Sequence, residues 1–372
     1  MMDDDLIAAA LRGESPEWPP KSDPATVVER AVYHGVASLI LAKAPQWPGA
    51  VMTALRSRAI AQAMWEMRHR MIVTQLLSGL TAAGVRTVIL KGTALAYDLY
   101  PDPAARSRGD TDLLIAPADL ERARAVLRDM GYVCAFGLDQ IDDGHLQEPW
   151  TVTTADGQSH DIDLHWQVLN AATLGPVITL SDAMDNTQPL PRLCLHAQAM
   201  PRVQTLLHAA AHRATHVTSP YFVGGAIHYG GDRLIWLCDI DLLARAFTAS
   251  EWDDLCKIAA ERGVGPVCLE GLQSARVHLG TPVPLGVIDR LTALPAGPAT
   301  TYLTGSRQVG RAWQDLGAKR GLIAKSEFIL ARIFPPEPFL RAKYPDLSQR
   351  PLPLLYLRRM IDFFRSRGSS SK

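Results

Sequence analysis

Apolar residues recur every three or four positions along the first eighty residues of the chain. This spacing predicts helices over residues 27–43 and 51–80. Gly84 follows the second stretch, at a position where glycine commonly ends a helix. We therefore expect an N-terminal helical segment over residues 1–83, interrupted early by the prolines between residues 16 and 20.

Short β-branched runs replace this pattern from Arg86 onward. Strands are predicted over residues 87–90, 110–115 and 132–136, with one helix ending near Tyr100 and another over residues 120–130. An Asp-Gly turn then separates two more β-like runs, 150–154 and 159–166, as in a β-hairpin. This order of elements predicts a small α+β unit over residues 84–190.

Helical spacing returns after residue 200. The predicted helices cover residues 203–216, 232–247, 251–262, 264–279, 321–333 and 353–366. The predicted fold class is therefore α+β, with a small mixed-sheet core, N-terminal helices and a larger C-terminal helical domain over residues 191–372.

The composition excludes several classes of protein. Hydrophobic residues make up 47% of the chain and charged residues 20%, as in ordinary globular proteins. The 38 basic and 38 acidic side chains cancel, so an extended nucleic-acid-binding surface is not expected. No apolar run approaches the roughly 18 residues of a membrane span, and the acidic start is unlike a secretory signal. The five cysteines are never spaced as C-x-x-C, which indicates neither a disulfide framework nor a zinc site, and we expect a cytoplasmic protein.

The cancelled charge hides a local polarity. Residues 137–163 contain seven acidic residues and no Lys or Arg, which suits a cation-binding site. Residues 341–372 contain eight basic residues against two acidic ones. This basic tail could hold an anionic acceptor or form the solvated face of a helix.

Three Asp-x-Asp pairs are candidates for metal binding: Asp110 and Asp112, Asp161 and Asp163, and Asp239 and Asp241. Residues i and i+2 share a face of a strand, whereas they diverge on a helix. Only the first two pairs lie in strand-like sequence, so only these two could share a metal ion. For either pair alone, the plain structural interpretation is that one Asp caps a strand or a turn.

Clustered carboxylates repel one another, and burying them is costly unless a cation is bound. Oxygen ligands favour Mg²⁺ or Mn²⁺, and these ions commonly serve phosphate chemistry. Gly92 and Thr93 follow a predicted strand and begin a predicted helix, where backbone N–H groups can bind phosphate oxygens. The combination favours a phosphate-transfer site.

Several motifs together resemble the nucleotidyltransferase superfamily that includes DNA polymerase beta and antibiotic adenylyltransferases. More narrowly, the chain resembles a bacterial family of uncharacterised nucleotidyltransferases. The matching motifs are Leu90-Lys91-Gly92, the Arg-x-Arg-Gly-Asp-x-Asp-Leu-Leu-Ile core that starts at Arg106, Asp163-Leu164-His165-Trp166, Leu206-Leu207-His208 with His212, and Trp236-Leu237 with Asp239-Ile240.

The resemblance implies a role for each matching residue. Asp110 and Asp112 would hold two divalent ions, Mg²⁺ or Mn²⁺, and Asp163 would be the third carboxylate ligand and help to deprotonate the acceptor. The remaining expected site residues bind the nucleoside triphosphate (NTP) and are Lys91, Gly92, Thr93, Arg106, Arg108 and His165. For each arginine, an ordinary surface ion pair is the alternative. His165 contacts the metal or the phosphates, or else simply partners Asp163.

The implied reaction moves a nucleoside monophosphate from an NTP to a hydroxyl or phosphate acceptor and releases pyrophosphate. The acceptor would be a small molecule, a peptide or a saccharide, and the resemblance suggests tailoring of a natural product or polysaccharide.

Two other functions stay open from the sequence. His208, His212 and His216 recur every four residues on one helix face, but Ala209 stands where a zinc protease has its catalytic Glu. A metal-dependent phosphohydrolase could use His208, His212 and Asp239, although we expect a structural or substrate-lining role for the histidines, near the nucleotide, and pairing of Asp239 within the helical domain. A catalytically degenerate NTP-binding regulatory or scaffold protein is the second alternative, and the intact aspartates argue against it.

Overall fold

The computed structural model describes residues 2–43, 46–134, 146–217, 220–223, 226–229 and 231–305, together with 314–317, 321, 325–326, 337, 340–341, 344, 347 and 350–359. The helix prediction over residues 321–333, the second half of the one over residues 353–366, most of the basic tail and residues 137–145 of the acidic segment lie wholly or largely outside these ranges. Residues 352–359 are helical.

The N-terminal part is helical, as predicted. Its helices are α1 (Met2–Leu11), α2 (Pro24–Tyr33), α3 (Ala37–Lys43) and α4 (Gly49–Ala82). The prediction of one helix over residues 27–43 is wrong, because Gly35 adopts a left-handed φ of 71° and α2 and α3 are bent by 115° at this break. Helix α1 was not predicted; three aspartates in its first turn stabilise it through the helix dipole.

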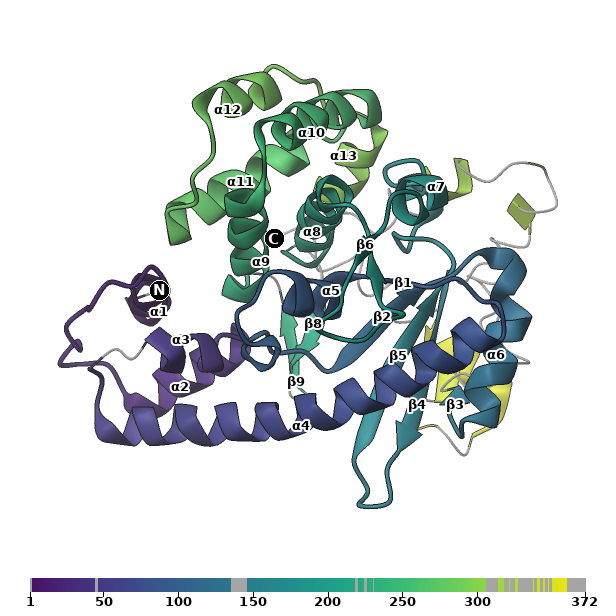
Figure 1. The fold of residues 1–372 in the computed structure, drawn as a ribbon, viewed down its shortest axis with the longest axis horizontal. Coiled ribbons are helices and arrows are strands. Elements are labelled where there is room, and N and C mark those ends of the chain that lie inside the picture. The colour runs from purple at the N-terminus through teal and green to yellow at the C-terminus, as the bar shows by residue number, and fades with distance from the viewer. Residues whose placement is uncertain are drawn as a thin grey trace.

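One mixed seven-stranded sheet forms the centre of the molecule, in the order β3-β4-β5-β2-β1-β7-β6 (Figure 1). Its strands are β1 (Val88–Ile89), β2 (Asp110–Leu114), β3 (Val133–Cys134), β4 (Gln147–Thr153), β5 (Ser159–His165), β6 (Gln188–Pro189) and β7 (Gln198–Ala199). Strands β4 and β5 form the predicted hairpin, and β5 pairs with β2 in parallel. The short strands β6 and β7 were not predicted.

Helices lie on both faces of the sheet (Figure 1). The short helix α5 (Lys91–Asp98) follows β1, and α6 (Leu120–Asp129) follows β2. Helices α4 and α6 pack on one face, where Leu76 and Leu127 share a core with Leu113, Ile162 and other residues of the sheet. Leu114 points to the opposite face, into the core that the helical part forms.

The C-terminal part is mostly helical. Its elements are α7 (Leu180–Met184), α8 (Arg202–Val217), β8 (Pro220–Val223), β9 (Ala226–Tyr229), α9 (Leu234–Ala246), α10 (Ala249–Arg262), α11 (Gly265–Leu279), α12 (Leu285–Thr292) and α13 (Pro298–Thr304). The α+β fold class is thus confirmed. Among the described residues, no single helix has the length and apolar character needed to cross a membrane; α2 and α3 pass that test only as a bent pair.

Candidate active site

Parallel pairing of β2 and β5 brings together Asp112 and Asp163, two of the three predicted carboxylate ligands, whereas Asp110 is not a member of this group. The register places Asp110 opposite Asp161, and Asp112 opposite Asp163. Side chains alternate along a strand, so Asp110 and Asp112 share a face with Leu114, which belongs to the core on the helical side. The carboxylates therefore face the C-terminal helices rather than α4.

Asp112, Asp163 and His165 each offer a ligand atom, and these atoms lie within 4.8 Å of one another. Among the described residues, this is the one group of three or more such side chains that could hold a metal ion. His165 Nε2 lies 2.9 Å from Asp112 Oδ1, so the partner of this histidine is Asp112 rather than Asp163. Two carboxylates and an imidazole are suitable ligands for a divalent cation such as Mn²⁺.

Burial and mutual repulsion change the protonation of these groups. Burial and the charges of Asp112 and Asp110 raise the pKa of Asp163 to about 7. Burial and the charge of Asp112 also raise the pKa of Asp110. Burial alone would raise the pKa of Asp112, but attraction to Lys91 and the contact with His165 outweigh burial and hold it well below its usual range. A bound cation would stabilise the charged forms of Asp110 and Asp163.

Lys91 connects the carboxylates to the start of α5. Its ammonium group forms an ion pair with Asp112, which keeps its pKa above the usual value despite burial. Lys91 has a left-handed φ of 47°, which is uncommon for a residue with a side chain. Leu90 precedes the helix and provides no side-chain cap, so the first N–H groups of α5 have no capping side chain. Such a helix start can bind an anion.

The Arg106 side chain is not free within the site, because it forms an ion pair with Asp239 of the helical part. Its Nε and Nη2 atoms donate to the two oxygens of Asp239 at 3.0 and 2.7 Å, and the Tyr100 hydroxyl donates to Oδ1 at 2.7 Å. The expectation that Asp239 pairs within the helical domain is therefore wrong. A Cβ at Gly92 would lie 3.2 Å from Arg106 Nη1, so the glycine leaves space for this guanidinium.

A sequence model of one protein family, described as an uncharacterised nucleotidyltransferase, matches residues 20–280. The chain belongs to this nucleotidyltransferase family. No curated protein matches the chain significantly. The matched region begins before α2 and extends through α11, so it includes the sheet and the helices on both of its faces.

The second arginine of this nucleotidyltransferase, Arg108, is held from the opposite side of the sheet. Its Nη2 atom forms an ion pair with Glu66 of α4 at 2.6 Å, and its Nε atom donates to Thr93 Oγ1 at 2.9 Å. Tyr97 donates a further hydrogen bond to Glu66. Arg108 is thus a buried ion-pair residue rather than a surface one, and the Thr93 hydroxyl already has partners within the protein.

A buried polar network continues behind Thr93, and sequence reasoning missed it. Thr111 Oγ1 lies 2.8 Å from Thr93 Oγ1 and 2.7 Å from His69 Nε2. His69 also contacts His160, and burial together with the charge of Arg108 lowers the pKa of His69 to about 3. The sequence contained one signal of this network, because Glu66 is the single acidic residue between positions 49 and 82.

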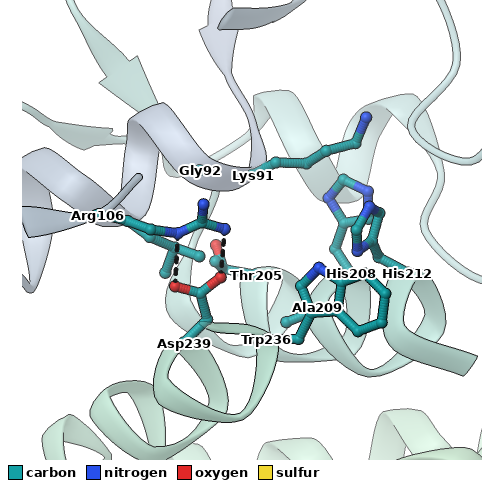
Figure 2. A pocket seen from close by; sticks show the side chains of 10 residues that line it. Lys91, Gly92, Arg106, Thr205, His208, Ala209, His212, Trp236 and Asp239 are labelled. Carbon is teal, nitrogen blue, oxygen red and sulfur yellow. Dashed lines mark hydrogen bonds and ion pairs between the residues drawn. The ribbon is translucent and has the colours of Figure 1, made fainter. Parts of the chain in front are cut away.

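A pocket lies between the start of α5 and helices α8 and α9 (Figure 2). It is lined by Lys91, Gly92, Leu95, Arg106, Thr205, His208, Ala209, His212, Trp236 and Asp239. The two histidines thus lie near the expected phosphate-binding residues, as predicted. Among the described residues, no metal-binding group is formed by His208, His212 and Asp239. Asp239 instead accepts hydrogen bonds from Arg106. The phosphohydrolase alternative therefore lacks its ligand set.

Proposed function

We propose that this nucleotidyltransferase moves a nucleoside monophosphate from an NTP to a hydroxyl or phosphate acceptor, with Mg²⁺ or Mn²⁺, and releases pyrophosphate. The observation that carries the proposal is the meeting of Asp112, Asp163 and His165 on neighbouring parallel strands, next to the uncapped start of α5. Membership of the nucleotidyltransferase family supports the same reaction class. The acceptor we propose is a small molecule, peptide or saccharide of a tailoring pathway.

Asp110, Asp112 and Asp163 are the residues that we propose as metal ligands, with His165 beside them. Divalent ions held there would neutralise phosphate charge and favour in-line attack on the α-phosphorus. The donor set fits this role, because burial and neighbouring carboxylates raise the pKa values of Asp110 and Asp163 when no cation compensates them.

The protein's own residues would then position the reactants and move one proton. Asp163 is half-buried beside Asp112, and in its charged form it would accept the proton of the acceptor hydroxyl. The acceptor oxygen would form a bond to the α-phosphorus as the bond to the pyrophosphate oxygen breaks. The Lys91 ammonium and the first N–H groups of α5 would stabilise the charge on the triphosphate.

The experiment is a panel of NTPs with Mg²⁺ or Mn²⁺ and pools of small molecules, peptides and saccharides, read by pyrophosphate release and by the mass of the modified acceptor. Asp112→Asn and Asp163→Asn should each lower the rate at least about a hundredfold. Asp161→Asn is the matched control, because Asp161 is an exposed carboxylate on the same strand as Asp163, hydrogen-bonded to Thr151. Full activity of the first two variants would refute the proposal. Binding of NTP without any pyrophosphate release would favour the degenerate scaffold.

A further inference from the structure

The pocket beside α5 contains a histidine that the proposed reaction does not yet use. His208 lies on α8, its residue is only 3% exposed, and it lines the pocket together with Lys91 and Gly92. Figure 2 shows the Lys91 side chain extending over the imidazoles of His208 and His212. Within the part of the chain that the structure describes, no hydrogen bond engages the His208 ring. A buried imidazole in this position is available to a ligand.

The chemistry of the pocket favours an anion. Lys91 is cationic, and the first turn of α5 has no capping side chain. The carboxylate that lines the pocket, Asp239, is neutralised by two hydrogen bonds from Arg106 and a third from Tyr100. Burial and the charge of Lys91 lower the pKa of His208 to about 3, so the ring is neutral and has one N–H donor.

The position of Lys91 indicates which anion reaches the pocket. This residue lines the pocket, and its ammonium group also contacts Asp112 of the carboxylate group. If the α-phosphate lies at the carboxylates, a triphosphate that follows the start of α5 brings its terminal phosphates to His208. We propose that His208 donates a hydrogen bond to these terminal phosphates and so holds the pyrophosphate that leaves. This inference rests on the proposed function and assigns a subsite within it.

The test measures the binding of inorganic pyrophosphate with Mg²⁺ to the full chain by isothermal titration calorimetry, since this probe does not depend on the base of the NTP. His208→Phe keeps the buried ring but removes its N–H group, and it should weaken binding at least tenfold. His208→Gln keeps an N–H donor and should bind more tightly than His208→Phe. His196→Ala, an exposed histidine outside the pocket, should bind like the wild type.

The outcomes separate this subsite from the proposed reaction. If the wild type releases pyrophosphate from an NTP while His208→Phe binds pyrophosphate as tightly as the wild type, the subsite is wrong and the reaction stands. If the Phe and Gln variants lose the same affinity, the loss reflects packing, and the subsite is again wrong. If the wild type neither binds pyrophosphate nor releases it from any NTP, both proposals fail.

Discussion

The ion pair between Arg106 and Asp239 is a buried link between the segment that leads into β2 and the helical part. Two hydrogen bonds join the guanidinium to the carboxylate at 3.0 and 2.7 Å. The side chains are only 11% and 6% exposed. Asp239→Asn would therefore leave the Arg106 charge buried without a counterion.

The burial of this ion pair determines how much free energy of unfolding the substitution removes. Loss of one partner of a buried ion pair reduces the free energy of unfolding by about 3–5 kcal/mol. The Asn carbonyl still accepts one hydrogen bond, so we expect a loss near the lower value, about 3 kcal/mol. Asp241→Asn is the matched control on the same helix, because its partner Arg245 is 47% exposed. That control should lose less than about 1 kcal/mol.

Urea denaturation followed by circular dichroism measures both free energies of unfolding. A loss for Asp239→Asn that is no larger than that for Asp241→Asn would refute the reasoning. Arg106 would then be free to leave Asp239 and bind phosphate, as the sequence first suggested.

Four further predictions concern the candidate site. Glu66→Gln should lower the urea midpoint and raise the KM for NTP several-fold, because Glu66 holds Arg108 and Arg108 in turn positions Thr93. Met67→Ala, at an exposed position on the same helix, should change neither quantity. The affinity for Mn²⁺, measured by calorimetry, should rise from pH 5.5 to 8. Asp163 has a pKa of about 7 and must lose its proton to bind a cation. An affinity that does not change with pH would contradict this. Without cation, the same raised pKa means that the folded state binds the proton more tightly than the unfolded state, so the melting temperature should fall as the pH rises towards and past 7. Gly92→Ala should weaken pyrophosphate binding, because the added methyl group would push Arg106 away from Asp239 and leave an uncompensated carboxylate in the pocket. Unchanged binding would contradict this reasoning.

Local patterns were enough to predict the strands that carry the aspartates. The alternation around Asp110 and Asp112 and the Asp-Gly turn before Asp163 are properties of short segments, and both strands formed as expected. Their parallel pairing is a long-range contact, and it is this pairing that aligns Asp112 with Asp163. Resemblance to a family, rather than periodicity, indicated that the two pairs belong to one site.

The partners of the arginines could not be predicted in the same way. Arg106 and Arg108 were expected to bind phosphate, and the structure places their guanidiniums on Asp239 and Glu66. These carboxylates lie 133 and 42 positions away in the chain. The choice of an ion-pair partner depends on how the helices pack against the sheet, and this packing cannot be predicted from the local spacing of residues. The break at Gly35 has a different cause, because a glycine that ends a helix is a local signal of the kind seen at Gly84, and the apolar spacing was given more weight than this glycine.

The two arginines also bear on the boundaries that we expect at residues 83 and 190. Both arise from the segment that leads into Asp110, and each is buried against a carboxylate from a different flanking part of the chain. Glu66 lies before residue 84 and Asp239 after residue 190. A unit restricted to residues 84–190 would therefore contain the carboxylates of the candidate site but would leave Arg106 and Arg108 without their counterions. Because an unpaired buried charge is strongly destabilising, the flanking helices belong to the candidate active site as physical supports, whatever boundary the sheet itself suggests.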